Sequence, residues 1–182
     1  MSNKEIELKF IINEEIKTQI IADLEQKTSK ISEKSLIDTY YVPYYRDFEI
    51  NGETMECVRI REDDKGSVLA YKKIHREANP VFCDEYETKV ESKNEMEKIL
   101  FALGFEVQMV IDKTRISYSL GNLEFDFDSV KGLGELLEVE LKNSDDVSVI
   151  YDYVSKYGLA EKDVTYKGIQ VLMKEAYKKE TN

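Results

Sequence analysis

Eight segments of the chain alternate between apolar and polar side chains with a period of two residues. This pattern is typical of β-strands that bury one face and leave the other polar. Most of the segments are joined by short connections, such as the turn expected at residues 63–66, and short connections favour antiparallel pairing. The sequence therefore predicts about eight antiparallel strands, at residues 4–12, 37–42, 56–62, 67–74, 81–90, 110–120, 123–130 and 135–141.

Four further segments have apolar residues at helical spacing. Asn13 can cap the first of them, and Ser92 with Glu95 forms a capping-box pattern at the start of the second. The chain contains neither a linker nor an internal repeat, and 182 residues suffice for one core, so we expect a single α+β domain over residues 1–182. The helices are expected after Asn13, at residues 92–103, and at about 144–157 and 165–179.

The polar faces of the predicted strands carry pairs of like charges. Residues i and i+2 share a face and lie about 6.5–7 Å apart, whereas solvated strand faces ordinarily favour Thr, Ser, Gln and mixed charges. One interpretation is that these faces are simply the exposed surface of an acidic protein, but six such pairs in 182 residues weaken it. The pairs are Glu5/Glu7, Arg59/Arg61, Glu85/Glu87, Lys113/Arg115, Asp126/Asp128 and Glu138/Glu140.

A sheet that closes on itself would bring all these polar faces into one interior. Buried charges are costly without a partner, so such an interior must be wet or occupied by a ligand. Clustered cations in a chain of net charge −11 indicate a compact polyanion, and the carboxylates suit Mg²⁺ or Mn²⁺ ions that bridge to it. This combination is typical of a polyphosphate, most naturally a triphosphate. The interior cations would be Lys9, Arg59, Arg61, Lys72, Lys113 and Arg115.

Composition disfavours several other functions. The 26 basic and 37 acidic residues disfavour binding to nucleic acid or to an anionic membrane surface. No apolar run approaches the roughly 20 residues that span a bilayer, and residues 1–9 lack the apolar stretch of a signal peptide. Cys57 and Cys83 stand alone in predicted strands, which favours a cytoplasmic location. Because His75 is the only histidine, zinc sites and histidine-based nucleophile sets are disfavoured, and the sequence has no glycine-rich phosphate loop.

The charged motifs, taken in order, resemble those of the CYTH family, the triphosphate tunnel metalloenzymes. A single match would be weak, but the matches keep their order from residue 5 to residue 166. Within the family, the N-terminal motif and residues 38–41 look most similar to class IV adenylate cyclases. The matching motifs are Glu5-Ile6-Glu7-Leu8-Lys9, Arg59-Ile60-Arg61, Tyr71-Lys72, Glu85-Tyr86-Glu87, Lys113-Thr114-Arg115, Asp128, Gly132-Leu133-Gly134, Glu138, Glu140 and Thr165-Tyr166.

The resemblance implies an eight-stranded antiparallel β-barrel with helices packed outside and a triphosphate in its interior. It implies Lys9, Lys72 and Asp128 as catalytic residues, and it suggests a homodimer. The triphosphate-binding residues would be Lys9, Arg59, Arg61, Lys72, Lys113 and Arg115. The ligands of Mg²⁺ or Mn²⁺ would be Glu5, Glu7, Glu85, Glu87, Asp128, Glu138 and Glu140.

Three activities are compatible with these residues. The favoured one is an adenylate cyclase, which converts ATP into cyclic AMP and pyrophosphate. A hydrolase of thiamine triphosphate or inorganic tripolyphosphate would use the same tunnel, so the sequence does not separate the two. A non-catalytic phosphate-binding module is the third interpretation, and it is disfavoured because a pure anion binder has no need of the acidic pairs.

Overall fold

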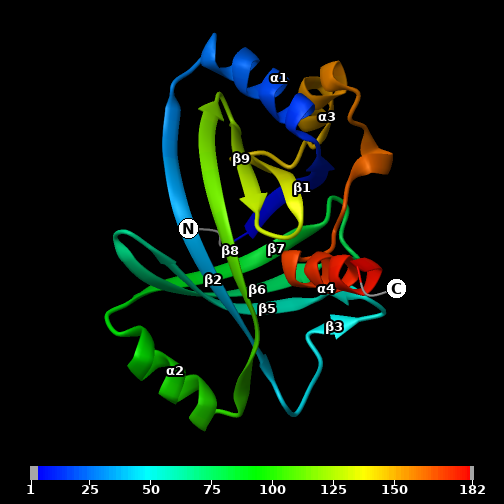
Figure 1. Cartoon of the computed structure of the whole chain (residues 1–182). Helices are drawn as coiled ribbons and strands as arrows, with labels where there is room; N and C mark the ends of the chain where they lie inside the picture. Colours follow the sequence, from blue (N-terminus) through cyan, green and yellow to red (C-terminus); the bar gives the residue numbers. More distant parts are fainter. Residues whose placement is uncertain (1–3, 181–182) are drawn as a thin grey trace.

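The computed structural model describes residues 4–180 and contains a closed antiparallel β-barrel (Figure 1). The strands follow one another around the barrel in the order β1, β10, β9, β8, β2, β5, β6, β7, and β7 pairs with β1 to close the ring. The predicted eight-stranded barrel is therefore confirmed. Its strands are β1 (Lys4–Ile12), β2 (Lys30–Pro43), β5 (Glu56–Asp63), β6 (Gly66–His75), β7 (Phe82–Val90), β8 (Phe105–Leu120), β9 (Leu123–Val130) and β10 (Gly134–Leu141).

Two barrel strands are longer than the alternating pattern predicts. The predicted starts at residues 37 and 110 are wrong, because β2 begins at Lys30 and β8 at Phe105. The two strands pair from Lys30 opposite Tyr118 to Pro43 opposite Phe105. Residues 30–35 are mostly polar and lack the alternation that marks a half-buried strand. Residues 105–109 do alternate between apolar and polar side chains, and this signal was missed. A small hairpin, β3 (Glu49–Ile50) and β4 (Glu53–Thr54), was not predicted.

The helix caps predicted at Asn13 and Ser92 are confirmed, but the bond from the Ser92 N–H to the Glu95 side chain that would complete a capping box is not found among the described residues. Before α1 (Glu14–Glu25), the Asn13 side chain accepts a hydrogen bond of 2.8 Å from the N–H of Ile16. Before α2 (Lys93–Ala102), Ser92 Oγ accepts one of 3.4 Å from the N–H of Glu95. These bonds satisfy donors that the first turn of a helix leaves free.

The last two helices begin four residues later than predicted. α3 (Ser148–Val154) continues as a short 3-10 turn over Ser155–Tyr157, and α4 spans Ile169–Glu180. Residues 165–168 bond to other strands instead of forming a first helical turn. The N–H of Thr165 donates to the Lys9 carbonyl of β1 at 2.8 Å, and the N–H of Gly168 donates to Thr54 Oγ1 of β4, in the small hairpin, at 3.0 Å. Within residues 4–180, no helix is long and apolar enough to cross a bilayer.

The helices cover the outer, apolar faces of the barrel (Figure 1). α1 and α3 pack on the outer side of β1, β9 and β10, where Phe10, Phe125 and Leu137 are fully buried. α2 covers the outer side of β2 and β5. α4 lies across one end of the barrel, where Leu172 and Met173 pack with residues near the ends of β9 and β10. With the apolar side chains on the outside, the polar faces of the strands are left for the interior.

Candidate active site

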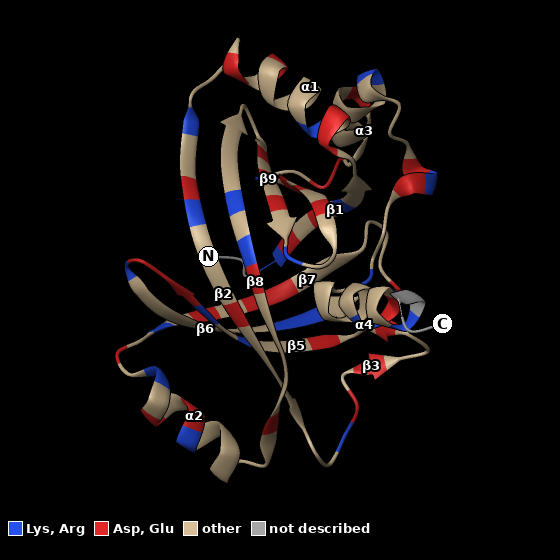
Figure 2. Ribbon diagram, viewed as in Figure 1, with Lys and Arg blue, Asp and Glu red and all other residues tan. Residues whose placement is uncertain are grey.

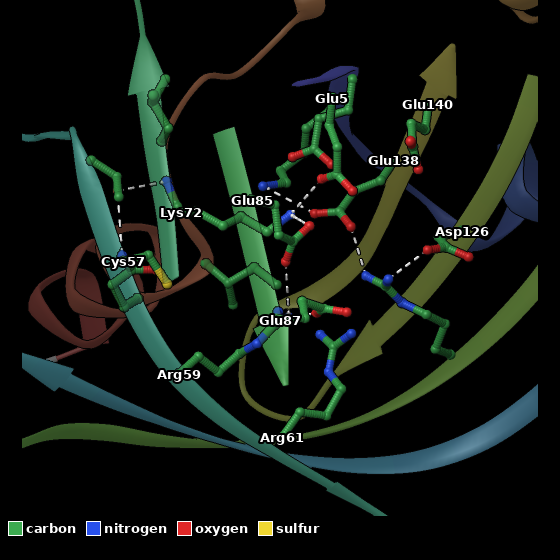
Figure 3. A pocket seen from close by; sticks show the side chains of 18 of the residues that line it. Glu5, Cys57, Arg59, Arg61, Lys72, Glu85, Glu87, Asp126, Glu138 and Glu140 are labelled. Atoms are coloured by element: carbon green, nitrogen blue, oxygen red, sulfur yellow. Dashed lines mark hydrogen bonds and ion pairs between the residues drawn. The ribbon is translucent and has the colours of Figure 1, made fainter. Parts of the chain in front are cut away.

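The barrel interior is a charged cavity of about 310 Å³. Its wall is built by strand alternation: on β1 the side chains of Glu5, Glu7 and Lys9 face the cavity, while those between them are buried under α1 and α3. Charges of both signs lie along the strands that surround it (Figures 2 and 3). The predicted site residues that line it are Glu5, Glu7, Lys9, Arg59, Arg61, Lys72, Glu85, Glu87, Lys113, Arg115, Glu138 and Glu140.

Asp128 is the predicted site residue that does not line the cavity. It is completely buried, and its Oδ2 lies 2.7 Å from Lys113 Nζ. Arg115 donates to both Asp128 oxygens at 2.6 Å. Both oxygens are thus occupied by cations, which is not the arrangement that the predicted metal ligand requires. The neighbouring carboxylate of the same strand, Asp126, faces the cavity instead (Figure 3).

Lys72 joins two acidic strands on one wall. Its Nζ lies 2.7 Å from Glu85 Oε2 and 3.1 Å from Glu5 Oε2. Burial raises the pKa of Glu5, and the hydrogen bond that its protonated form donates to Glu85 raises it further. Burial alone would raise the pKa of Glu85, but this hydrogen bond and the charge of Lys72 lower it below the ordinary value. The pKa of Glu5 is therefore raised and that of Glu85 lowered, with the ammonium group of Lys72 beside both.

The pKa values of Lys9 and Lys113 shift in opposite directions, because the strongest charge effects on these two buried lysines differ in sign. Burial alone would lower the pKa of Lys9, but the negative charges of Glu138 and Glu7 outweigh this effect and raise it. Lys9 Nζ lies 3.0 Å from Glu138 Oε1. For Lys113, burial and the adjacent charge of Arg115 lower the pKa to about 8. Lys9 is therefore a permanent cation at neutral pH.

Arg59 differs from the other cations that line the cavity in its hydrogen bonding. Its side chain is about nine-tenths buried, and its Nε has no hydrogen-bond partner among the described residues. The nearest carboxylates lie 3.7 Å away in Asp38 and Glu87 and 3.9 Å away in Glu85. Figure 3 shows Arg59 and Arg61 directed into the pocket. A buried guanidinium with an unpartnered donor is suited to an anionic ligand.

Several functional positions were missed from the sequence. The most important is Asp38, which was noted within residues 38–41 but was given no role in the site. It is a fully buried carboxylate that accepts two hydrogen bonds of 2.7 and 2.9 Å from Arg61. The signal that could have found it is a single acid inside the apolar, β-rich segment 37–42. Residues 168–170, at the start of α4, close one end of the cavity. The lining residues that were not predicted are Tyr40, Thr54, Cys57, Ile74, Glu124, Asp126, Lys142, Gly168, Ile169 and Gln170.

The donor set fits a hard divalent cation that arrives together with its phosphate ligand. With both groups ionised, Glu85 Oε1 is buried beside Glu5 and lacks a hydrogen-bond donor. Within residues 4–180 no three carboxylate, thiol or imidazole groups converge tightly enough to hold a metal by themselves. Mg²⁺ is usually bound by one or two carboxylates together with substrate phosphates, so three converging protein ligands are not required.

The barrel is closed, and its interior cavity is lined by seven cations and eight carboxylates. The cavity lies at the low end of the size range for small-molecule sites. These features suit a tunnel for a compact polyanion accompanied by a hard cation. The CYTH domain family matches residues 3–169, and the chain belongs to this family.

Known relatives agree with this assignment. A Methanocaldococcus jannaschii protein named "Putative adenylate cyclase" is 34% identical over 142 residues, which is 78% of each chain. The PH1012 protein of Pyrococcus horikoshii OT3 has a similar structure, with a TM-score of 0.77, 27% identity, and coverage of 93% of this chain and 99% of that one. The Hippeastrum protein HpAC1, described as a "putative adenylyl cyclase" with a dominant triphosphatase activity, has a TM-score of 0.59, 14% identity, and coverage of 91% and 90%.

Proposed function

We propose that the protein is a divalent-metal-dependent enzyme that acts on a triphosphate bound in the barrel interior, and that the reaction is the conversion of ATP into cyclic AMP and pyrophosphate. The observation that carries the proposal is that all six predicted cations line one cavity, and that one of them, Arg59, is buried with an unpartnered donor. Buried cations of this kind bind phosphate oxygens through charge-assisted hydrogen bonds.

The cations divide into two groups by their surroundings. Arg59 and Arg61 lie on β5 and can hold phosphate oxygens with planar, forked donors. Lys9 and Lys72 lie among the carboxylates of β1, β7 and β10 and supply positive charge where negative charge develops on the leaving pyrophosphate. Asp128 acts through Lys113 and Arg115, which it holds in place, and is a positioning residue in this proposal.

The metal ligands in this proposal are the cavity-lining carboxylates of β1, β7 and β10. Glu5, Glu7, Glu85, Glu138 and Glu140 lie on three strands, and Glu87 is half exposed at the rim. A bound Mg²⁺ or Mn²⁺ would act as a Lewis acid on the phosphate oxygens. The carboxylates of the protein carry out a second task, because they offset the charges of the cations while no substrate is bound.

The cyclase is supported by the relative that is 34% identical and is named an adenylate cyclase. A second candidate, a triphosphatase, is supported by the size of the interior. The cavity of about 310 Å³ lies at the low end of the range for small-molecule sites, and the adjoining pocket beside Tyr166 and Phe82 measures about 70 Å³. These dimensions suit a ligand that consists mainly of phosphates.

Product identification separates these activities. We would incubate the protein with ATP, thiamine triphosphate and tripolyphosphate, each with Mg²⁺ or Mn²⁺, and resolve the products by chromatography. Cyclic AMP with pyrophosphate is expected for the cyclase, and orthophosphate from any of the substrates indicates the hydrolase. Arg59→Ala, purified identically, controls for contaminating enzymes. Tight binding without turnover would leave a phosphate-binding module, and absence of binding would refute the proposal.

A further inference from the structure

Asp38 lies at the centre of three tunnel cations. Its Oδ1 accepts from Arg61 Nε at 2.7 Å, and its Oδ2 accepts from Arg61 Nη2 at 2.9 Å. The same Oδ2 lies 3.4 Å from Lys113 Nζ and 3.7 Å from Arg59 Nη1. Asp38 is fully buried and does not line the cavity, whereas all three cations do. The carboxylate therefore stands behind the cations, on the side away from a ligand.

The position of Asp38 follows from strand register. On β2, Asp38 lies opposite Arg61 of β5 on one side and Ile111 of β8 on the other. Tyr40, two residues further on, lies opposite Arg59, and both line the cavity. Asp38 thus shares the interior face of β2 with Tyr40. Its side chain is short, so its carboxylate lies nearer the barrel wall than the longer guanidinium groups of Arg59 and Arg61, which line the cavity. The sheet itself fixes the carboxylate at the base of the cation cluster.

A carboxylate in this position has a physical purpose. Three positive groups that are close together in a buried site repel one another, and each arginine has several rotatable bonds. A two-point contact with a fixed carboxylate restricts the Arg61 guanidinium to one orientation and offsets the repulsion. Cations that are already ordered lose less entropy when they bind phosphate oxygens.

We propose that Asp38 is a positioning residue, which holds Arg61 directly, and Arg59 and Lys113 through its charge, in the arrangement that receives a triphosphate. This inference rests on the proposed function, because it assumes that the three cations bind the phosphates. It assigns Asp38 no contact with the substrate or with a metal ion. Its effect passes through the cations, chiefly through Arg61.

An opposing effect must be weighed. Removal of Asp38 makes the tunnel more positive, and this change alone would strengthen anion binding. Asp38→Asn also turns one acceptor into an amide donor that faces the Arg61 donors, so the guanidinium must move away from its site. Asp38→Glu retains the charge but shifts the carboxylate by one methylene group. A role in charge alone predicts wild-type binding for Asp38→Glu, whereas a positioning role predicts weaker binding.

The test measures tripolyphosphate binding by calorimetry in EDTA, so that neither turnover nor metal contributes. We expect Asp38→Asn and Asp38→Glu to weaken binding at least about tenfold, the value of one lost charge-assisted contact. Asp112→Asn is the matched control, because Asp112 is exposed on the outer face of β8 opposite Ile37, and we expect wild-type binding. Wild-type or tighter binding by Asp38→Asn, or wild-type binding by Asp38→Glu, would overturn the inference.

A double-mutant cycle tests whether Asp38 acts through Arg61. If it does, Asp38→Asn combined with Arg61→Ala binds tripolyphosphate about as weakly as Arg61→Ala alone. If the affinity losses of the two single variants instead multiply in the double variant, Asp38 and Arg61 act independently and the inference is overturned. Each variant is first checked for a native circular dichroism spectrum. Weaker binding in the cycle is then not caused by a general loss of stability.

A measurement on the wild-type protein keeps the inference testable even if the Asp38 variants fail to fold. The Arg61 Nε–H signal in the NMR spectrum, assigned by comparison with Arg61→Lys, should be protected from solvent exchange before any ligand is added. Protection that arises only after tripolyphosphate binds would overturn the inference. Failure of the wild-type protein to bind any triphosphate would instead refute the proposed function, whatever the state of the Arg61 signal.

Discussion

Replacement of Asp128 by asparagine distinguishes an anchor for buried cations from a metal ligand. Asp128 and Lys113 are both completely buried, and Asp128 also receives two hydrogen bonds from Arg115. Loss of one partner of a buried ion pair leaves charge without compensation and costs about 3–5 kcal/mol. For a chain of 182 residues the entropy of unfolding is about 0.4 kcal/mol/K, so Asp128→Asn should lower the melting temperature by about 10 °C.

The assay is thermal and urea denaturation of the metal-free protein, followed by circular dichroism. Asp112→Asn, with the same change of charge on the exposed outer face of β8, should stay within about 0.5 kcal/mol of the wild type. If Asp128 were instead one of several carboxylates that repel one another while they await a metal, Asp128→Asn would leave the melting temperature unchanged or raise it. That result would refute the anchoring role and restore Asp128 to the metal site.

Three other predictions address the remaining parts of the tunnel. Glu7→Gln should abolish turnover with Mg²⁺ but leave tripolyphosphate binding in EDTA equal or tighter, because one carboxylate that repels the anion is gone; activity with unchanged metal dependence would contradict this. Arg59→Ala should weaken triphosphate binding by about 1.5–3 kcal/mol in calorimetry, and a large fall in melting temperature would instead indicate a structural ion pair. Burial and the hydrogen bond to Glu85 raise the pKa of Glu5 to about 8. The folded state therefore binds more protons than the unfolded state between the ordinary pKa of about 4.3 and about 8, so stability in EDTA should fall as the pH rises through this window. A flat profile in urea denaturation, or the same decline in Glu5→Gln, would contradict that assignment.

The alternating pattern and the cap residues determined much of this fold from sequence alone. Successive side chains of a strand point to opposite faces, so Ile6 and Glu7 must lie on opposite sides of the barrel wall. The helix caps at Asn13 and Ser92 depend on residues three positions apart, so they too could be predicted from neighbouring residues. The same local logic identified the lining residues of β1, β5, β7 and β10, because like-charged pairs at i and i+2 are conspicuous in a sequence.

The alternation of side chains along a strand does not determine how deeply a side chain is buried or which partner it contacts. Asp126 and Asp128 share one face of β9, yet Asp126 lines the cavity while Asp128 is buried beneath Lys113 and Arg115. Asp38 meets Arg61 only because β2 pairs with β5 in one register. These contacts depend on the stagger of strands that are far apart in the chain, and only the closed barrel fixes that stagger. For the same reason, the start of α4 at Ile169 was decided by bonds from residues 165–168 to β1 and to the small hairpin, which local helix signals do not encode.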